Sequence, residues 1–355
     1  MENIHNSPTL KIDLAALARN YALLKSKAGG KCSAVVKANA YGLGVREAAL
    51  ALYDVGCREF FVATLEEGVE LRNTLVTGHG SQAAIYVFHG VRKNQAKDFI
   101  AHELIPVLND RAQIEHWNNA GPAALHIDTG MCRLGVTPAE AETLAAHHWT
   151  LILSHLACAN EAAHPGNAKQ LTLFKKALAH FPGARASLAN SSGIFLSNEH
   201  HFNLARPGCS LYGISPDTAR PNPMEHVATL SAPVLQYRVI DHDQPVGYGG
   251  TATARKGSVL ATVELGYADG FQRVLSNHAF GYAAGVKVPL IGRVSMDMVS
   301  IDVSSVPEHL RTPDLRIEFI CRQQPVDMLA EAAGTIGYEI FTGLGRRIKR
   351  VYRHE

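Results

Sequence analysis

The feature that most constrains the fold of this chain is a regular alternation of strand-like and helix-like stretches. Eight short apolar runs have the length and composition of buried strands: 33–38, 59–63, 83–88, 104–108, 123–127, 150–154, 185–188 and 202–205. Between most of them lie patterns of helical period, such as 65–73, 110–119, 138–147 and 167–180. Strands that alternate with helices predict parallel βαβ units, and eight of them over about 200 residues predict a (β/α)8 TIM-type barrel.

The pattern changes after Gly213. The segment 215–223 carries three prolines and indicates a linker, and β-type runs follow it at 227–240, 258–265, 286–294, 298–303 and 315–320. Only one clear helix is predicted there, at 326–333. We therefore expect an α/β chain with two domains: a barrel over 1–225 and a mostly β domain over 226–355. The alternative is an open doubly wound sheet, but KANAYGLG after the first strand is not G-x-G-x-x-G.

Charge and cysteine usage exclude several classes of function. The 355 residues include 34 Lys and Arg against 32 Asp and Glu, and this net charge of +2 gives no reason to expect nucleic acid or an anionic membrane as partner. The first residues show no secretory signal, and no apolar run nears the ~20 residues that span a bilayer. The six cysteines are scattered without Cys-x-x-Cys, which favours a cytoplasmic protein with free thiols and no metal site.

Unusual polar residues follow the predicted barrel strands. Each has a structural explanation: Lys37 could extend from the strand end to solvent, His155 could be a core histidine, and Ser191 could cap a helix. Together they favour a site, because ligand chemistry in this barrel gathers at the carboxyl ends of the strands. The set is Lys37, Asp128, Arg133, His155, Asn190, Ser191 and Arg206.

Two of these features together suggest pyridoxal phosphate. A partly desolvated lysine has a lowered pKa and can form a Schiff base, which suits Lys37. Ser191 and the Gly208-Cys209 pair follow the seventh and eighth strands, where such barrels usually bind phosphate. An aldehyde cofactor that is held by its phosphate needs both.

The chain also resembles the alanine racemase family. The motifs that carry the resemblance occur in order: VVKANAYGLG (35–44), DTGMCRLG (128–135), SHLACAN (154–160), ANSSG (189–193), RPGCSLYG (206–213), GYGGTATA (247–254), ELGYADGF (264–271), GRVSMDM (292–298) and GTIGYEI (334–340). They cover both predicted domains. The resemblance implies a (β/α)8 barrel followed by a β domain, and an isomerase that uses pyridoxal 5'-phosphate.

The resemblance also implies roles for individual residues. Lys37 would hold the cofactor and act as a base on one face of the substrate's α-carbon, and Tyr267 would act on the other face. A tyrosine with a pKa of about 10 needs nearby positive charge to act as a base, and His155 and Arg206 would supply it. Arg206 would also face the pyridine nitrogen of the cofactor. An arginine stays charged, so it would keep that nitrogen unprotonated and suppress transamination.

The remaining roles concern the phosphate, the substrate and the assembly. The residues that match phosphate-contacting positions are Tyr41, Ser191, Gly208, Cys209 and Tyr338. Arg133 would contact the cofactor's phenolic oxygen and the substrate carboxylate, and the backbone of Met296 would give that carboxylate a second contact. In the family, Tyr267 and Met296 reach the site from the neighbouring subunit, which implies a homodimer with composite sites.

One position departs from the family pattern. His126 stands where the family often carries a lysine that can be carboxylated to brace the arginine, here Arg133. A carbamate is excluded at this position. A neutral imidazole hydrogen bond and a bound anion both stay open as the brace.

The predicted function is the interconversion of L-alanine and D-alanine, which supplies D-alanine for peptidoglycan. The alternatives are a racemase of broader specificity that accepts serine or other amino acids, a non-enzymatic carrier of pyridoxal phosphate, and a basic amino-acid decarboxylase. Tyr267 in a second domain argues against the carrier. Together with Arg206 it favours racemisation over decarboxylation, because racemisation needs a proton donor on each face of the α-carbon.

Overall fold

The computed structural model describes residues 7–80 and 83–354, which form two compact units. One unit is Ala15–Glu225, and the other joins residues 7–14 to residues 226–354. The second unit thus resumes at His226, next to the predicted domain boundary. Residues 1–6 lie outside the described residues. The prediction that the first residues hold no secretory signal falls partly on them.

The unit Ala15–Glu225 is built on a parallel sheet of seven strands in sequence order. They are β2 (Ala34–Val35), β3 (Glu59–Val62), β4 (Ala84–Val87), β5 (Leu104–Leu108), β6 (Ala124–His126), β7 (Leu151–Leu153) and β8 (Ala186–Ser187). The segment around Ala205 closes the ring. The Ser33 amide donates to the Ala205 carbonyl at 2.9 Å, and the Asn203 amide donates to the Ala186 carbonyl at 2.9 Å. The predicted (β/α)8 barrel fold is confirmed, but the eighth predicted strand, 202–205, forms only an isolated bridge at Ala205.

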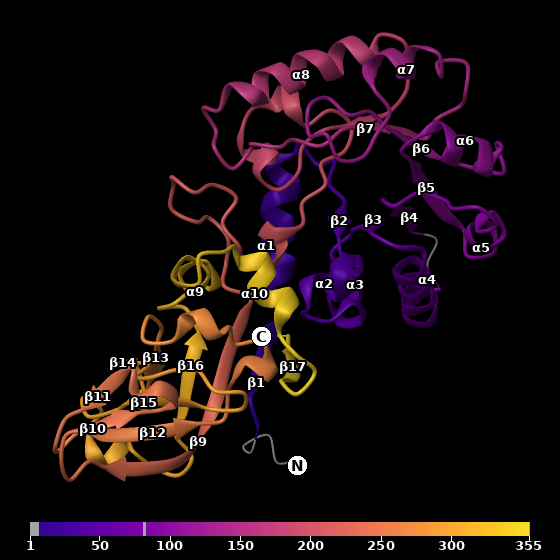
Figure 1. Ribbon diagram of the computed structural model, residues 1–355. Coiled ribbons are helices and arrows are strands. Elements are labelled where there is room, and N and C mark those ends of the chain that lie inside the picture. The colour runs from indigo at the N-terminus through magenta and orange to yellow at the C-terminus, as the bar shows by residue number, and fades with distance from the viewer. Residues whose placement is uncertain (1–6, 81–82, 355) are drawn as a thin grey trace. The chain divides into compact units, whose positions relative to one another are not determined.

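Helices alternate with these strands (Figure 1). They are α1 (Leu14–Lys27), α2 (Lys37–Tyr41), α3 (Val45–Asp54), α4 (Leu65–His79), α5 (Ala96–Ala101), α6 (Arg111–Trp117), α7 (Pro138–Glu142) and α8 (Pro165–Leu178). Capping boxes start α4 at Thr64 and α7 at Thr137, as Thr-x-x-Glu sequences favour. Apolar side chains fill the barrel, one from each of β2 to β6, two from β7 and one from the closing segment. They are Val35, Phe61, Tyr86, Val107, Ala124, Leu151, Leu153 and Leu204.

The stretch after β2 differs from the predicted strand over 33–38. Its strand is only Ala34–Val35, and Ala38 to Tyr41 have φ between 52° and 56°, in the left-handed region. Left-handed backbone costs an L-residue roughly 1–2 kcal/mol, so tertiary contacts must hold this run. Apolar residue types predicted the strand, but they carry no signal for a left-handed turn.

The second unit is a mostly β domain. Its strands are β1 (Thr9–Asp13), β9 (Ala228–Val239), β10 (Gln244–Val246), β11 (Ala252–Ala254), β12 (Val259–Val263), β13 (Phe280–Ala283), β14 (Val286–Pro289), β15 (Val299–Asp302), β16 (Arg316–Ile320) and β17 (Lys349–Arg353). The main path runs β14-β13-β16-β9-β1-β17, and β12 pairs with β9 and β15. β10 and β11 form a separate hairpin.

Five strands and one helix of this domain were not predicted: β1, β10, β11, β13, β17 and α10. β1, from the start of the chain, pairs antiparallel with β9 and parallel with β17, so the sheet joins both ends of the chain. The prediction of a single clear helix was wrong, because α10 (Gly337–Gly343) follows α9 (Val326–Ala332). Over the ranges that the structure describes, no helix combines the length and the apolar character needed to cross a bilayer.

Candidate active site

Lys37 follows β2 at the carboxyl end of the barrel and is half-buried. Burial lowers the pKa of its amine, Arg133 lowers it further, and the Glu67 carboxylate opposes both effects. Its Nζ lies 6.0 Å from the centre of the Phe88 ring. The predicted lowering of this pKa by desolvation is therefore present, and the lysine does not extend freely into solvent.

Aromatic rings lie between Lys37 and Arg206. The Phe88 ring stacks on the Phe61 ring with 5.1 Å between centroids, and the Arg206 guanidinium lies 5.9 Å from the Phe61 ring centre. Because ring faces attract cations, this apolar surface can accept two positive groups. In the sequence, Phe61 and Phe88 are marked only as residues of the predicted strands 59–63 and 83–88.

Arg206 is buried, with a relative exposure of 2%, and two hydrogen bonds fix its guanidinium. It donates to the Ser187 hydroxyl and, at 2.5 Å, to the Ser154 carbonyl. Its Nε has no acceptor among the described residues. Burial lowers the pKa of Arg206 to about 9, so it stays charged at neutral pH. A buried charged donor without an acceptor is costly, and a ligand with an acceptor atom would remove that cost.

His155 follows β7 and is an uncharged imidazole in this structure. Burial holds the pKa of His155 well below its ordinary value, and nearby basic groups lower it further: Arg206, Arg133, His126 and Lys37. Positive charge near this point therefore comes from Arg206 rather than from His155. Gln170 holds the loop, because its Nε2 donates to the His155 carbonyl at 2.9 Å and its Oε1 accepts from the Ala157 amide at 2.9 Å.

Arg133 is an exposed residue of the loop after β6. The Asp128 carboxylate shapes this loop by accepting from the backbone amides of Gly130, Met131 and Cys132 at 2.8–2.9 Å. Burial alone would raise the pKa of Asp128, but the three hydrogen bonds lower it. The carboxylate is thus ionised, and it organises the loop that carries the arginine.

His126, at the end of β6, is buried in a single tautomer. The side-chain NH₂ of Asn109 donates to the Phe88 and Val107 carbonyls at 2.9 and 2.8 Å. The side-chain oxygen Oδ1 of Asn109 must therefore accept from His126 Nδ1, at 2.9 Å. Burial lowers the pKa of His126 to about 4, with Arg206 adding to the effect. Because Nδ1 carries the proton of this neutral ring, Nε2 carries a lone pair.

The loops after β8 and the closing segment bring three predicted phosphate-contacting residues together. Ser191 Oγ accepts from the Gly208 amide at 2.9 Å, and a β-carbon at Gly208 would collide with the Tyr41 hydroxyl. Cys209 follows and is buried. A short helix, the 3₁₀ turn Ser192–Phe195, follows Ser191, but the Ser191 side chain makes no capping hydrogen bond with it. Only glycine at 208 permits this close packing.

Tyr267, Met296 and Tyr338 belong to the β domain. The Tyr267 amide donates to the Ser295 carbonyl at 3.1 Å, next to Met296, and both predicted residues are exposed, by 42% and 53% respectively. Tyr338 lies in α10, the unpredicted helix. The structure thus brings Tyr267 and Met296 together within this unit.

An ion-pair network fixes the loops of Tyr267 and Met296. Arg347 donates to Asp269 at 2.8 Å and to Asp297 at 2.7 Å. The other Asp269 oxygen accepts from the Gly266 amide at 2.9 Å. Asp269 is only 2% exposed, so its pair with Arg347 is more shielded than a surface ion pair, whereas Arg347 and Asp297 are both 51% exposed and their pair is a surface one.

Four residues that hold the predicted ones in place carry no signal in the sequence as site residues: Glu67, Asn109, Gln170 and Arg347. Thr64-x-x-Glu67 was visible as a capping box. The contact of Glu67 with the turn after Lys37 was not, because it joins segments of different βα units. No local pattern marks such contacts between distant segments.

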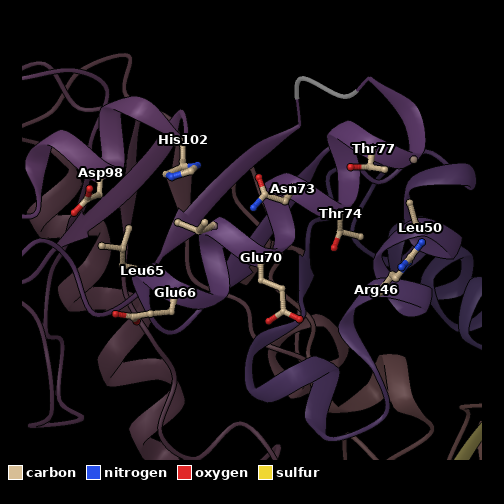
Figure 2. Close-up of a pocket in the computed structure, with 12 residues that line it drawn as sticks. Arg46, Leu50, Leu65, Glu66, Glu70, Asn73, Thr74, Thr77, Asp98 and His102 are labelled. Carbon is tan, nitrogen blue, oxygen red and sulfur yellow. The ribbon is translucent and has the colours of Figure 1, made fainter.

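The structure also has a groove of about 790 Å³ on the outer helices of the barrel unit. Figure 2 shows its lining from α3, α4 and α5, with Arg46, Glu66, Glu70 and Asp98 among the polar side chains. None of the predicted site residues lines it. We therefore place the candidate active site at the strand ends and not in this groove.

The strand ends of this barrel carry a half-buried lysine, a buried arginine and a loop of glycine and serine. These features place the chain in the class of barrel enzymes that bind an anionic ligand. Residues 12–216 match the family model of the alanine racemase N-terminal domain, and residues 227–352 match that of the C-terminal domain. The chain belongs to the alanine racemase family.

Its relatives match it over nearly its whole length. It is 47% identical to the alanine racemase of Rhodospirillum rubrum, over 97% of this chain and 95% of that protein. It is 43% identical to a protein of Agrobacterium fabrum named alanine racemase, catabolic, over 97% and 91% of the two chains. The alanine racemase of Bartonella henselae with covalently bound pyridoxal phosphate superposes with a TM-score of 0.90 at 38% identity, over 98% of this chain and 99% of that one.

Proposed function

We propose that this chain is an alanine racemase that interconverts L-alanine and D-alanine with pyridoxal 5'-phosphate bound at Lys37. The observation that carries the proposal is the cluster of Lys37, Arg133, His155 and Arg206 at the barrel strand ends, where these groups act on one another's pKa values. A cluster of basic groups suits a ligand that carries a phosphate and a carboxylate. Its relatives bear the name of this activity.

The residues fit this cofactor on two further observations. The unpartnered Nε–H of Arg206 matches the acceptor nitrogen of an unprotonated pyridine ring. Ser191, Gly208 and Cys209 lie in the loops where such barrels hold phosphate, and Tyr41 packs against Gly208. Tyr338 is proposed as a further phosphate contact, and His155 as a cofactor-binding residue. When bound, pyridoxal phosphate withdraws electrons from the α-carbon of the substrate, so that its proton can leave.

The chain's own residues would move the proton. Lys37, whose pKa burial lowers, would act as a base on one face of the α-carbon. Tyr267 would give or take the proton on the other face. Arg133 would bind the substrate carboxylate, helped by the backbone N–H of Met296. With a base on each face, a proton removed from one face of the α-carbon can be replaced on the other, in either direction between the two enantiomers.

The neutral His126 is proposed as the brace for Arg133. Its Nδ1–H is committed to Asn109, so the Nε2 lone pair is the part of the ring that can accept from a cation. The charge of Arg133 is among those that lower the pKa of His126, after burial and Arg206. Of the two braces that the sequence left open, this observation favours the imidazole over a bound anion.

The assembly, location and role are also proposals. The exposure of Tyr267 and Met296 supports a homodimer in which these residues complete the partner's site. The cysteines within the described ranges are free thiols, which supports a cytoplasmic protein. Its product would then supply peptidoglycan with D-alanine, and deletion of its gene should create a requirement for D-alanine if this role is correct.

A racemisation assay over a panel of L-amino acids with purified protein tests the proposal. We expect turnover of alanine above all other substrates, and loss of both turnover and the cofactor absorbance in Lys37→Ala. Comparable turnover of serine would instead support the broader racemase. A bound cofactor without turnover would support a carrier, and release of CO₂ would support a decarboxylase.

A further inference from the structure

The turn that follows Lys37 needs an external constraint. Its residues from Ala38 to Tyr41 are left-handed, and the strain is partly offset by bonds within the turn, such as Gly42 amide to Ala38 carbonyl at 2.8 Å. The amide of Ala38, which is adjacent to Lys37, bonds to none of these residues. It donates to Glu67 Oε1 at 2.7 Å.

Glu67 joins two βα turns with one carboxylate. While Oε1 accepts from Ala38, Oε2 accepts from the Ala63 amide at 2.7 Å and from the Thr64 amide at 3.3 Å. The capping box of α4 requires only the Thr64 contact. The contact with Ala38 is additional, and it connects the segment after β2 to the segment after β3.

Glu67 also sets the charge around Lys37. Of the charged groups that act on the Lys37 amine, Arg133 disfavours its protonated form and Glu67 favours it. His155 lies in the same cluster and is uncharged. Without Glu67, the amine would be surrounded by positive charge alone.

We propose that Glu67 is the positioning residue for Lys37: it fixes the turn that aims the amine and supplies its counter-charge. This inference rests on the role proposed for Lys37. A carboxylate is required because both oxygens accept. The amide of a glutamine would offer one acceptor, and its NH₂ would face either Ala38 or Thr64 with a donor.

Four variants separate these effects. Glu67→Gln keeps the reach and removes the charge, whereas Glu67→Asp keeps the charge and shortens the reach. Glu66→Gln is the matched control, because Glu66 is the neighbouring carboxylate and faces the outer groove (Figure 2). Thr64→Ala removes the helix cap without touching Ala38. Glutamine supports a capping box as glutamate does, so α4 should persist in Glu67→Gln.

The first measurement is the pH dependence of Lys37 labelling by an amine reagent in the cofactor-free full chain, quantified by mass spectrometry. We expect the labelling midpoint to move to lower pH in Glu67→Gln, and to stay at the wild-type value in Glu66→Gln and Thr64→Ala. An unchanged midpoint in Glu67→Gln would overturn the counter-charge. This readout needs neither cofactor nor turnover.

The second measurement is the rate at which added pyridoxal phosphate attaches to Lys37, followed by absorbance. At a pH above the labelling midpoint of every variant, where the amine is free in each, we expect about a tenfold slower attachment in both Glu67 variants, which corresponds to ~1.4 kcal/mol in the barrier. Rates equal to that of Thr64→Ala would overturn the positioning role. If the wild-type chain binds no cofactor at Lys37, the proposed function fails instead, and the labelling midpoints still decide the effect of Glu67 on the amine.

Discussion

At the scale of single residues, Arg206 shows how the barrel interior is prepared for a ligand. A buried guanidinium usually has an acceptor for every N–H, but Nε of Arg206 has none among the described residues. Two serines hold the rest of the group, through the Ser187 hydroxyl and the Ser154 carbonyl. The side chain is therefore fixed before any ligand arrives.

We expect Arg206→Lys to lower the free energy of unfolding of the cofactor-free barrel by about 1–3 kcal/mol, because lysine cannot satisfy both serines from one position. Urea unfolding followed by tryptophan fluorescence measures it, since both tryptophans, Trp117 and Trp149, are buried in the barrel unit. Arg19→Lys is the control. Arg19 pairs with Glu225 at the surface, so the change should be below about 1 kcal/mol. Equal losses would contradict the argument.

The lowered pKa of His126 predicts how the free energy of unfolding changes as the pH falls. Its pKa is about 4 in the folded chain and near 6.5 when unfolded, so between these values the unfolded chain binds a proton that the folded chain does not. Its stabilising effect is complete above pH 6.5 and is lost as the pH falls toward 4. It amounts to about 3 kcal/mol at most. In His126→Asn, which has no titrating group, unfolding free energy should fall less steeply over this window.

The control for that experiment is His148→Gln, because His148 is exposed. The same tryptophan-monitored urea curves at a series of pH values serve both variants. His155, whose pKa is also lowered, keeps some acid sensitivity in every variant. Parallel curves for wild type and His126→Asn would show that His126 is not held neutral.

At the scale of elements, the left-handed turn α2 predicts that an alanine-to-glycine substitution raises the free energy of unfolding there, whereas the same substitution in a right-handed helix lowers it. Ala38→Gly should stabilise the barrel by up to about 1 kcal/mol, because glycine adopts positive φ without steric cost and Ala38 is exposed. Ala18→Gly, in the right-handed helix α1, should destabilise it by about 1 kcal/mol. Urea unfolding of both variants checks this. Destabilisation by both substitutions would contradict the left-handed turn.

The same elements show what the sequence could predict. Periodicity placed the seven strands of the barrel sheet and most helices, because each buries one face in a repeating layer. The eighth predicted run, 202–205, forms only an isolated bridge. It could not place β1, whose partners β9 and β17 come from distant parts of the chain. For the site, strand-end chemistry marked Lys37 and Arg206. The contacts of Glu67 and Asn109 depend on which turns meet, and no local pattern encodes that.

At the scale of the whole molecule, the proposed chemistry divides one site between two chains. Lys37 lies in the barrel unit and Tyr267 in the β domain, at an exposed loop fixed by Arg347. If each site takes Lys37 from one subunit and Tyr267 from the other, two inactive variants can restore each other. A site contained within one chain cannot be rescued in this way.

We expect a mixture of Lys37→Ala and Tyr267→Phe, unfolded and refolded together, to recover about a quarter of the wild-type activity per chain. Half of the dimers formed at random are mixed, and each mixed dimer holds one site with both Lys37 and Tyr267. The measurement is alanine racemisation by the mixture against the sum of the two variants refolded separately. Lys37→Ala refolded with the double variant is the control, since no intact site can form. A mixture no more active than that sum would contradict the shared site. If each site lay within one chain, every site in the mixture would lack either Lys37 or Tyr267, and no activity would be recovered.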